Sequence, residues 1–426
     1  MKFSKLSQLA LVSGISLLAA SLLAGCYLIT IDYVFVASSA SSTAGSQGQV
    51  HAYAVDAESG AIRDVLGTVA SGGVNPVAMT TTSDYYNLYV ANQGSNTVVH
   101  FSIQNDGGLT QMDSITLPGP PAALAVNQAD TYLYVVSGSN TATLTEYALA
   151  SGTGAIGAPV QTVNLSLNCN ASKIANYPSD AMVPTGVAVL PGNGGVFVTA
   201  YDQSAYNPNL AVATPSSANP GWLFGMAVGA NGALAPAAQN CASSTGLKPY
   251  DVYEAGVRPS ALAIDPTGRF VYITDYASNT LIGYSVLSTD SLTLMLNGPF
   301  KTGNEPTAVL VDPRGLYIYV TNSLDNTVSA YAITLATGTP TNVVNTSGSA
   351  SNNTDSTPVA MTVEPSLGRF LFTANRLGDS VSGFLINPNN GALSALQDTP
   401  YPIAGSFPTA VVAVPHGNHA SETVAP

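Results

Sequence analysis

The residues best suited to chemistry in this sequence fall at two recurring positions. One position directly precedes a proline that opens an apolar run, and the other ends the aromatic-rich run that follows. The residues at or beside these positions are Arg258, Glu305, Asp275, Asn322, Asn375 and Arg376. Brought together, they would form a polar ring in which the arginines suit a carboxylate or a phosphate. The alternative is structural, because Asn and Asp at such positions cap the strand and bond to their own loop, and Arg258 can simply pair with Glu305.

The elements that would position these residues are short strands joined by turns. Residues 305–333, EPTAVLVDPRGLYIYVTNSLDNTVSAYAI, contain one continuous apolar run and two runs rich in β-branched and aromatic residues. These compositions are typical of strands, and the Asp-Pro-Arg-Gly segment at 312–315 has proline and glycine where a tight turn needs them. A weaker fourth strand is expected after Ile333. Four antiparallel strands of this length make one blade of a β-propeller.

The same unit recurs along the chain. Six full copies open at the prolines at 76, 121, 184, 259, 306 and 358. The chain ends supply the halves of a seventh copy, since residues 32–37 and 49–55 match the second and third strands and residues 407–414 match the first. We therefore predict an all-β fold, a seven-bladed β-propeller over residues 33–415. Pairing of the C-terminal strand with the N-terminal blade closes the ring and removes the open sheet edges.

The phrases YVTNSLDNTVSAYAI and FVYITDYASNTLIGYSV resemble the YVTN-type β-propeller repeat. The whole pattern is similar to the lactonase-like seven-bladed propeller superfamily, which includes 6-phosphogluconolactonase-type proteins. This resemblance implies lactone hydrolysis. Such a hydrolase needs a general base and a cation for the oxyanion, and the candidates among the residues of this chain are Glu305 or Asp275 as the base and Arg258 as the electrostatic partner. Related lactonases carry histidines in their middle blades. Here His51 and His100 lie in third-strand segments, where we expect them at the blade surface, so no catalytic residue is carried over from the family.

The N-terminus has the features of an export signal. Lys2 and Lys5 precede a mostly apolar core, and residues 23–26, Leu-Ala-Gly-Cys, resemble a bacterial lipobox. We expect a lipoprotein signal peptide at 1–25, lipidation of Cys26 and a short linker at 26–32. An ordinary signal peptide with an incidental cysteine is the alternative. The expected location is the bacterial cell envelope, with the outer membrane favoured because no Asp follows Cys26.

Extra residues concentrate in three segments, about 157–182, 201–220 and 235–257. We expect them to form a canopy over one mouth of the central channel, since long loops in a compact domain are more often functional than accidental. Cys169 and Cys241 lie in two of these segments and are predicted to form a disulfide, with two free cysteines as the alternative. The tail at 416–426 is expected to be disordered.

Charge excludes one class of partner. The chain has 11 Lys and Arg residues against 24 Asp and Glu. Removing Lys2 and Lys5 leaves nine basic residues and a balance of −15, which argues against binding nucleic acid. The sequence predicts no cofactor. It predicts no metal site either, because His416 and His419 offer only two ligands in a tail.

The sequence therefore favours a lipid-anchored, extracytoplasmic binding or interaction module. Its loop-rich channel face would take a protein, a glycan or a small anionic ligand. A lactonase-type hydrolase acting at the channel mouth and a purely structural envelope component are the alternatives.

Overall fold

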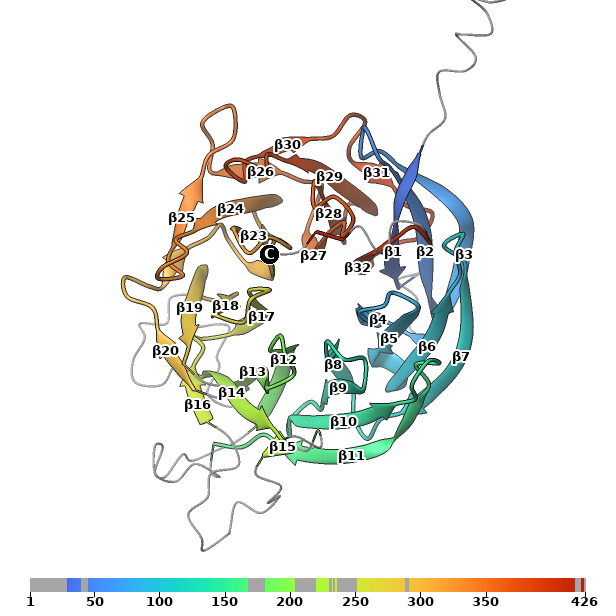
Figure 1. Ribbon diagram of the computed structural model, residues 1–426, viewed down its shortest axis with the longest axis vertical. Coiled ribbons are helices and arrows are strands. Elements are labelled where there is room, and N and C mark those ends of the chain that lie inside the picture. Colours follow the sequence, from blue (N-terminus) through green and yellow to red (C-terminus); the bar gives the residue numbers. More distant parts are fainter. Residues whose placement is uncertain are drawn as a thin grey trace, which may run out of the picture.

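The computed structural model describes residues 29–39, 45–167, 181–203, 220–229, 232, 234–235, 251–287, 291–417 and 423–424. They form seven antiparallel sheets arranged around a central axis (Figure 1). The predicted all-β, seven-bladed propeller is confirmed. Within these ranges η1 (Gln93–Ser95) is a 3-10 turn, and no helix is long and apolar enough to cross a membrane.

Each blade places one strand beside the axis and stacks the others outward from it. The innermost strands, in order from blade 1 to blade 7, are β32 (Pro408–Pro415), β4 (Pro76–Thr81), β8 (Pro121–Val126), β12 (Met182–Val189), β17 (Pro259–Ile264), β22 (Pro306–Val311) and β27 (Pro358–Val363). The second strands are β1 (Thr30–Ser38), β5 (Asn87–Asn92), β9 (Tyr132–Ser137), β13 (Gly195–Asp202), β18 (Phe270–Asp275), β23 (Tyr317–Asn322) and β28 (Phe370–Asn375). The third strands are β2 (Gln47–Asp56), β6 (Thr97–Ile103), β10 (Thr143–Leu149), β14 (Gly221–Val228), β19 (Thr280–Val286), β24 (Thr327–Ile333) and β29 (Ser380–Ile386).

The outer wall differs between the two halves of the ring. Blades 1 to 3 each end in one continuous strand: β3 (Ile62–Val74), β7 (Leu109–Thr116) and β11 (Ile156–Asn164). In blades 4 to 7 two short strands pair with the third strand instead. They are β15 (Leu234–Ala235) with β16 (Asp251–Glu254), β20 (Leu292–Leu294) with β21 (Phe300–Lys301), β25 (Pro340–Val343) with β26 (Ser351–Asn353), and β30 (Leu393–Ala395) with β31 (Tyr401–Pro402).

Turn carboxylates set the hairpin between the first two strands of a blade. Asp312 Oδ1 accepts the backbone N–H groups of Leu316 at 2.7 Å and Tyr317 at 2.8 Å. Asp265 and Glu364 hold the same turns in blades 5 and 7. These acidic residues therefore serve the fold on the face opposite the candidate ring.

The apolar core lies between the blades. The second strands of blades 2, 5, 6 and 7 are buried along their whole length. Phe270 and Tyr272 of blade 5 pack with Ile318 and Val320 of blade 6 in one cluster, and corresponding clusters join the other neighbours. Buried tyrosines add bonds across the same seams, because Tyr272 donates to the Gly338 carbonyl at 2.6 Å. Each blade thus depends on its neighbours for burial.

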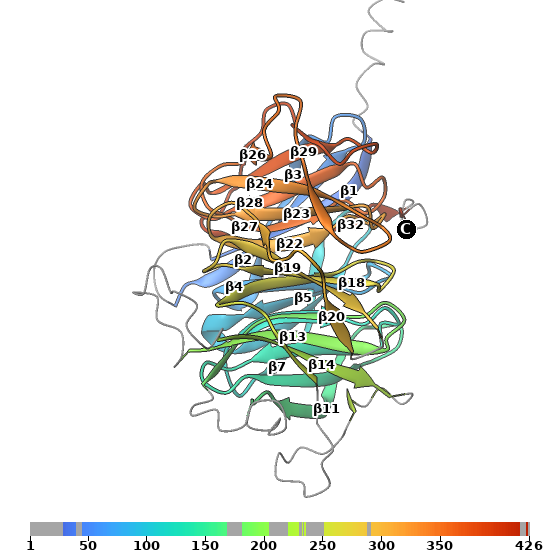
Figure 2. The same cartoon turned by 90° about the vertical axis from the view of Figure 1, so that its left-hand side faces the viewer.

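The closing strand pair predicted from the chain ends is present. β1 pairs antiparallel with β32 on one side and with β2 on the other, and Tyr33 lies opposite Val414 (Figures 1 and 2). β32 also contacts β27 and β4, its neighbours on either side. Within the tail, the His416 N–H donates to the Ile31 carbonyl at 2.8 Å and the Val424 N–H to the Pro365 carbonyl at 2.9 Å.

Two buried carboxyl groups meet at the seam between blades 1 and 7. The Ser366 hydroxyl donates to Asp32 Oδ1 at 2.7 Å, and Glu364 lies beside the same carboxyl. Both acids are completely buried. Burial and then the charge of Glu364 raise the pKa of Asp32 far above its ordinary value of 3.8. Asp32 is therefore held in the neutral form, in which its hydroxyl can donate to Glu364.

This pair makes stability at the seam depend on pH. Because folding raises the pKa of Asp32, the folded state keeps a proton that the unfolded state loses above pH 3.8. Stability therefore falls as pH rises from 3.8 towards the raised pKa of the folded state. Asp32→Asn fixes the neutral form, so it should stabilise the protein near neutral pH, by about 1–3 kcal/mol, and not at acidic pH. Urea unfolding of both proteins at pH 4 and pH 7 measures this. An equal loss of stability with pH in the two proteins would contradict the assignment.

Candidate functional site

The candidate residues lie at one end of blades 5 to 7. Pro259 pairs with Asp275, Pro306 with Asn322 and Pro358 with Asn375, so each first strand begins where the second strand ends. Blade-to-blade connections and second-to-third-strand loops share this face, which we call the channel face. Arg258, Glu305 and Arg376 belong to three consecutive blades on it.

Asp275 caps the connection that enters its own blade. Its carboxylate accepts the N–H groups of Val257 at 2.7 Å and Arg258 at 2.9 Å, and two N–H groups of its own turn at 3.2 and 3.4 Å. A Cβ on Gly256 would lie 2.1 Å from this carboxylate, so the close approach requires glycine. Asp275 is 1% exposed. Its oxygens are committed to backbone donors, which makes it unsuited to act as a general base.

Asn322 and Asn375 hold second-to-third-strand loops. Each is fully buried, and each amide group donates to two hydroxyls of the third strand, Thr327 and Ser329 in one case and Ser380 and Ser382 in the other. In blade 1 the corresponding contact joins Ser38 Oγ and His51 Nε2 at 3.0 Å. For Asp275, Asn322 and Asn375 the structure therefore has the capping arrangement rather than a ring of free polar groups.

The backbone of Glu305 makes a structural hydrogen bond, and its carboxylate lies at the rim of the channel face. Its φ is 54°, and its N–H donates to Asn279 Oδ1 of the preceding blade at 2.8 Å. Thr357 and Phe407 make the same bond to the blades before them, at 2.7 Å each. The carboxylate of Glu305 is half-buried, and the hydrogen bond that it accepts from the Ser323 hydroxyl is long, at 3.4 Å. This side chain is more available for chemistry than Asp275.

The two arginines occupy different environments. The Arg258 guanidinium carbon lies 4.8 Å from the Tyr276 ring centre and 5.6 Å from the ring of Tyr201 in blade 4, so its plane is held by aromatic contacts. Arg376 is exposed, and its backbone N–H donates to the Thr357 carbonyl at 2.8 Å. Among the described residues, no hydrogen bond or ion pair joins Arg258 to Glu305.

The expected exposure of two histidines is wrong. His51 is 1% exposed and His100 is completely buried. His100 Nδ1 contacts Asp113 Oδ2 and its Nε2 contacts Asn87 Oδ1, both at 2.9 Å. The third strand lies between two other strands and two neighbouring blades, which encloses these rings. Within the described ranges, no three His, Cys, Asp or Glu side chains are placed to hold a metal ion.

Sequence reasoning missed a buried acid in blade 3. Glu146 lies opposite Tyr134, where other blades have Gly283, Ala330 and Gly383. Burial raises the pKa of Glu146 to about 7, although the Tyr134 hydroxyl donates to Oε1 at 3.3 Å. The available signal was a charged residue inside TLTEYAL, where the corresponding phrase TLIGYSV has glycine.

Several predictions fall outside the described residues. Cys26, Cys169 and Cys241 are among them, as are the signal peptide at 1–25 and most of the three inserted segments. The first inserted segment begins within β11. The lipid anchor, the disulfide and the canopy stay predictions.

The seven sheets define the protein as a seven-bladed propeller. The sequence matches the family described as "Lactonase, 7-bladed beta-propeller" over residues 47–171 and 226–419. Because the match covers most of the chain, the protein belongs to that family. A comparison with curated proteins gave no match.

Solved structures share the architecture at low sequence identity. A proposed 6-phosphogluconolactonase from Bacteroides uniformis is 16% identical with a TM-score of 0.66, over 91% of this chain and 100% of its own. The periplasmic gluconolactonase of Pseudomonas aeruginosa is 18% identical with a TM-score of 0.65, over 90% of this chain and 99% of its own. A Lactobacillus plantarum protein has the same identity, TM-score and coverage. These similarities establish the fold alone.

The capping role of Asp275 can be measured directly. Asp275→Ala leaves the partly buried N–H groups of Val257 and Arg258 without this acceptor, so it should destabilise the protein by about 2–4 kcal/mol. Arg376→Ala, on the same face, should change stability by less than about 0.5 kcal/mol. Urea unfolding compares both with the wild type. If Asp275→Ala unfolds at the wild-type urea concentration, the capping role is refuted.

Proposed function

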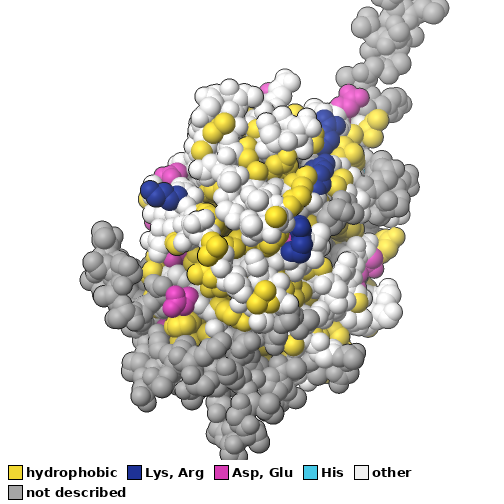
Figure 3. Space-filling view, turned by 60° about the vertical axis from the view of Figure 1, so that its left-hand side comes forward, with side chains coloured by type: hydrophobic (Ala, Val, Ile, Leu, Met, Phe, Trp, Pro, Cys, Tyr) yellow, Lys and Arg dark blue, Asp and Glu magenta, His cyan; other side chains and the backbone are white. Residues whose placement is uncertain are grey.

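We propose that the protein binds a small anionic ligand at the channel face of blades 5 to 7. One observation carries this proposal: Asp275, Asn322 and Asn375 are committed to loop bonds, while the side chains of Glu305 and Arg376 reach the same rim half-buried and exposed, on the same face as Arg258. Aromatic rings hold the plane of the Arg258 guanidinium, so this side chain loses less conformational entropy when it binds a ligand. The edge of a guanidinium suits a carboxylate or a phosphate. Charged side chains are sparse among the coloured residues on the side of the molecule shown in Figure 3.

Lactone hydrolysis is the second candidate, and family membership favours it. Glu305 would take a proton from water as the water attacks the lactone carbonyl. Arg258 would stabilise the negative charge on the carbonyl oxygen, after which the ring C–O bond breaks and the alkoxide takes a proton. The product is a hydroxy acid, so the same arginine would also bind the product carboxylate.

One set of proteins separates these functions. Residues 27–426 are prepared as the wild type, Glu305→Gln and Arg258→Met. The matched controls are Glu58→Gln, an exposed acid in the hairpin between β2 and β3, and Arg369→Met, an arginine 5.3 Å from the Phe370 ring in the hairpin between β27 and β28. Calorimetry follows gluconate and 6-phosphogluconate binding, and proton release follows hydrolysis of their lactones.

For a binding protein we expect anion binding without turnover, weakened about 10- to 100-fold by Arg258→Met and unchanged in the controls. Turnover that disappears in Glu305→Gln would establish the hydrolase instead. If the wild type shows no binding and no turnover, or if the controls change as much as the site variants, the proposed site is refuted. The structural envelope role would then be the function left.

We further propose that Cys26 carries the lipid anchor, because a positive segment, an apolar core and Leu-Ala-Gly-Cys occur in that order. In a bacterial host, the full chain should incorporate labelled palmitate and separate with membranes. Cys26→Ala should lose both properties, whereas Cys169→Ala should keep them. Unchanged labelling of Cys26→Ala would refute the anchor.

A further inference from the structure

A tyrosine of the third strand closes the outer seam between blades at two places. The Tyr284 hydroxyl of blade 5 donates to the Glu254 carbonyl of blade 4 at 2.5 Å. The Tyr331 hydroxyl of blade 6 donates to the Lys301 carbonyl of blade 5 at 2.7 Å. Both acceptors belong to the short outer strands, β16 and β21, that occur only in blades 4 to 7. The repeated bond therefore fills the space between the outer edges of two blades.

Tyr147 is the counterpart of these tyrosines in blade 3. It pairs with Leu133 as Tyr284 pairs with Val271 and Tyr331 with Ile318. Its side chain is 5% exposed, yet no described residue accepts a hydrogen bond from its hydroxyl. Blade 2 offers no short outer strand here, because β7 is continuous and is followed by Leu117 and the exposed Pro118.

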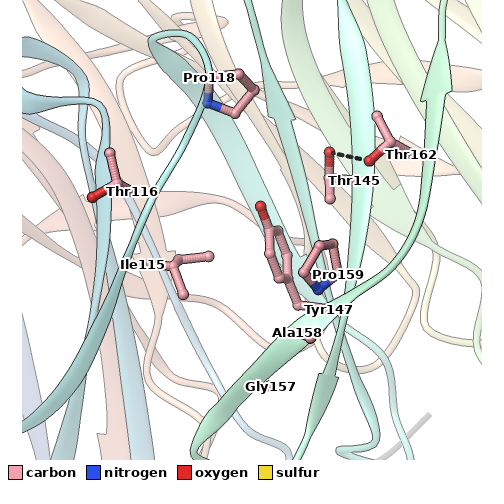
Figure 4. Close-up of a pocket in the computed structure, with 9 residues that line it drawn as sticks. All are labelled: Ile115, Thr116, Pro118, Thr145, Tyr147, Gly157, Ala158, Pro159 and Thr162. Carbon is pink, nitrogen blue, oxygen red and sulfur yellow. Dashed lines mark hydrogen bonds between the residues drawn. The ribbon is translucent and has the colours of Figure 1, made fainter.

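A cavity of about 420 Å³ lies between blades 2 and 3, on the side of Tyr147 where Tyr284 and Tyr331 bond to their preceding blades. Ile115, Thr116 and Pro118 of blade 2 form one wall, and β10 and β11 of blade 3 form the other (Figure 4). The Tyr147 hydroxyl points into the space between the walls (Figure 4). The volume lies in the range of small-molecule sites.

The walls are held at a fixed separation. The Ile156 N–H of blade 3 donates to Asp113 Oδ1 of blade 2 at 3.2 Å. The Tyr89 hydroxyl of blade 2 donates to the Gly154 carbonyl of blade 3 at 2.6 Å. Both bonds cross the seam beside the cavity, so the space is a built feature of the closed ring.

The lining specifies the chemistry of a ligand. It contains no charged side chain, so an ion entering it would lose water without gaining a counter-charge. Hydroxyls of Tyr147 and the Thr145–Thr162 pair lie beside apolar surface from Ile115 and the two prolines. An uncharged sugar ring has this same combination of hydroxyl edges and C–H faces. We propose that this groove between blades 2 and 3 binds an uncharged saccharide through Tyr147.

The groove is separate from the channel-face site, which lies on blades 5 to 7. Saturation-transfer NMR with the methyl glycosides of glucose, galactose and N-acetylglucosamine tests it, with glucuronate as the charged comparison. Ala158→Trp fills the groove from an exposed lining position. Tyr147→Phe removes the hydroxyl, and Tyr284→Phe is the matched control at a seam that is already closed.

We expect transfer to at least one glycoside and none to glucuronate. Ala158→Trp should abolish it, Tyr147→Phe should weaken binding about 2- to 12-fold, and Tyr284→Phe should leave it unchanged. Melting supplies a readout without sugar: Tyr284→Phe should lower Tm by about 2–4 °C because it loses a bond, and Tyr147→Phe should not. No glycoside binding to the wild type, or binding that persists in Ala158→Trp, would overturn the proposal.

Discussion

The burial of apolar surface between blades is the constraint on which the rest of the structure depends. Each cluster of buried residues draws on two neighbouring sheets, so a blade with one neighbour missing would leave a face of its second strand in water. This explains why β32 returns to β1 at the end of the chain. It also explains why the pKa of Asp32 at that seam is raised, since burial removes the water that would stabilise its charge.

The sequence was sufficient to predict the inner three strands of each blade. Their runs are apolar or alternating because they are enclosed by neighbours, and the three runs predicted within residues 305–333 are the observed strands β22, β23 and β24. The outer strands were not predictable in the same way. In blades 4 to 7 they are two to four residues long, too short for a periodic pattern, and each is held by a third strand.

The candidate site was predictable in position and not in role. A repeat places Asp275, Asn322 and Asn375 at the same strand end. An amide or carboxylate at that position can bind either a loop or a ligand, and it uses the same atoms in both cases. Only the bonds to Val257, Thr327 and Ser380 decide between them. For the two histidines the predicted exposure was wrong, because the alternation of residues in one strand does not reveal that the next blade covers its outer face.

In a repeating fold, the places where a repeated bond is absent carry more information than the places where it occurs. Tyr272 and Tyr319 both donate to a glycine carbonyl of the following blade, whereas Tyr134 donates to Glu146. Tyr284 and Tyr331 close the outer seam, whereas the hydroxyl of Tyr147 faces a cavity. Both of these departures belong to blade 3, so the side chains at its two seams differ from those of blades 5 and 6.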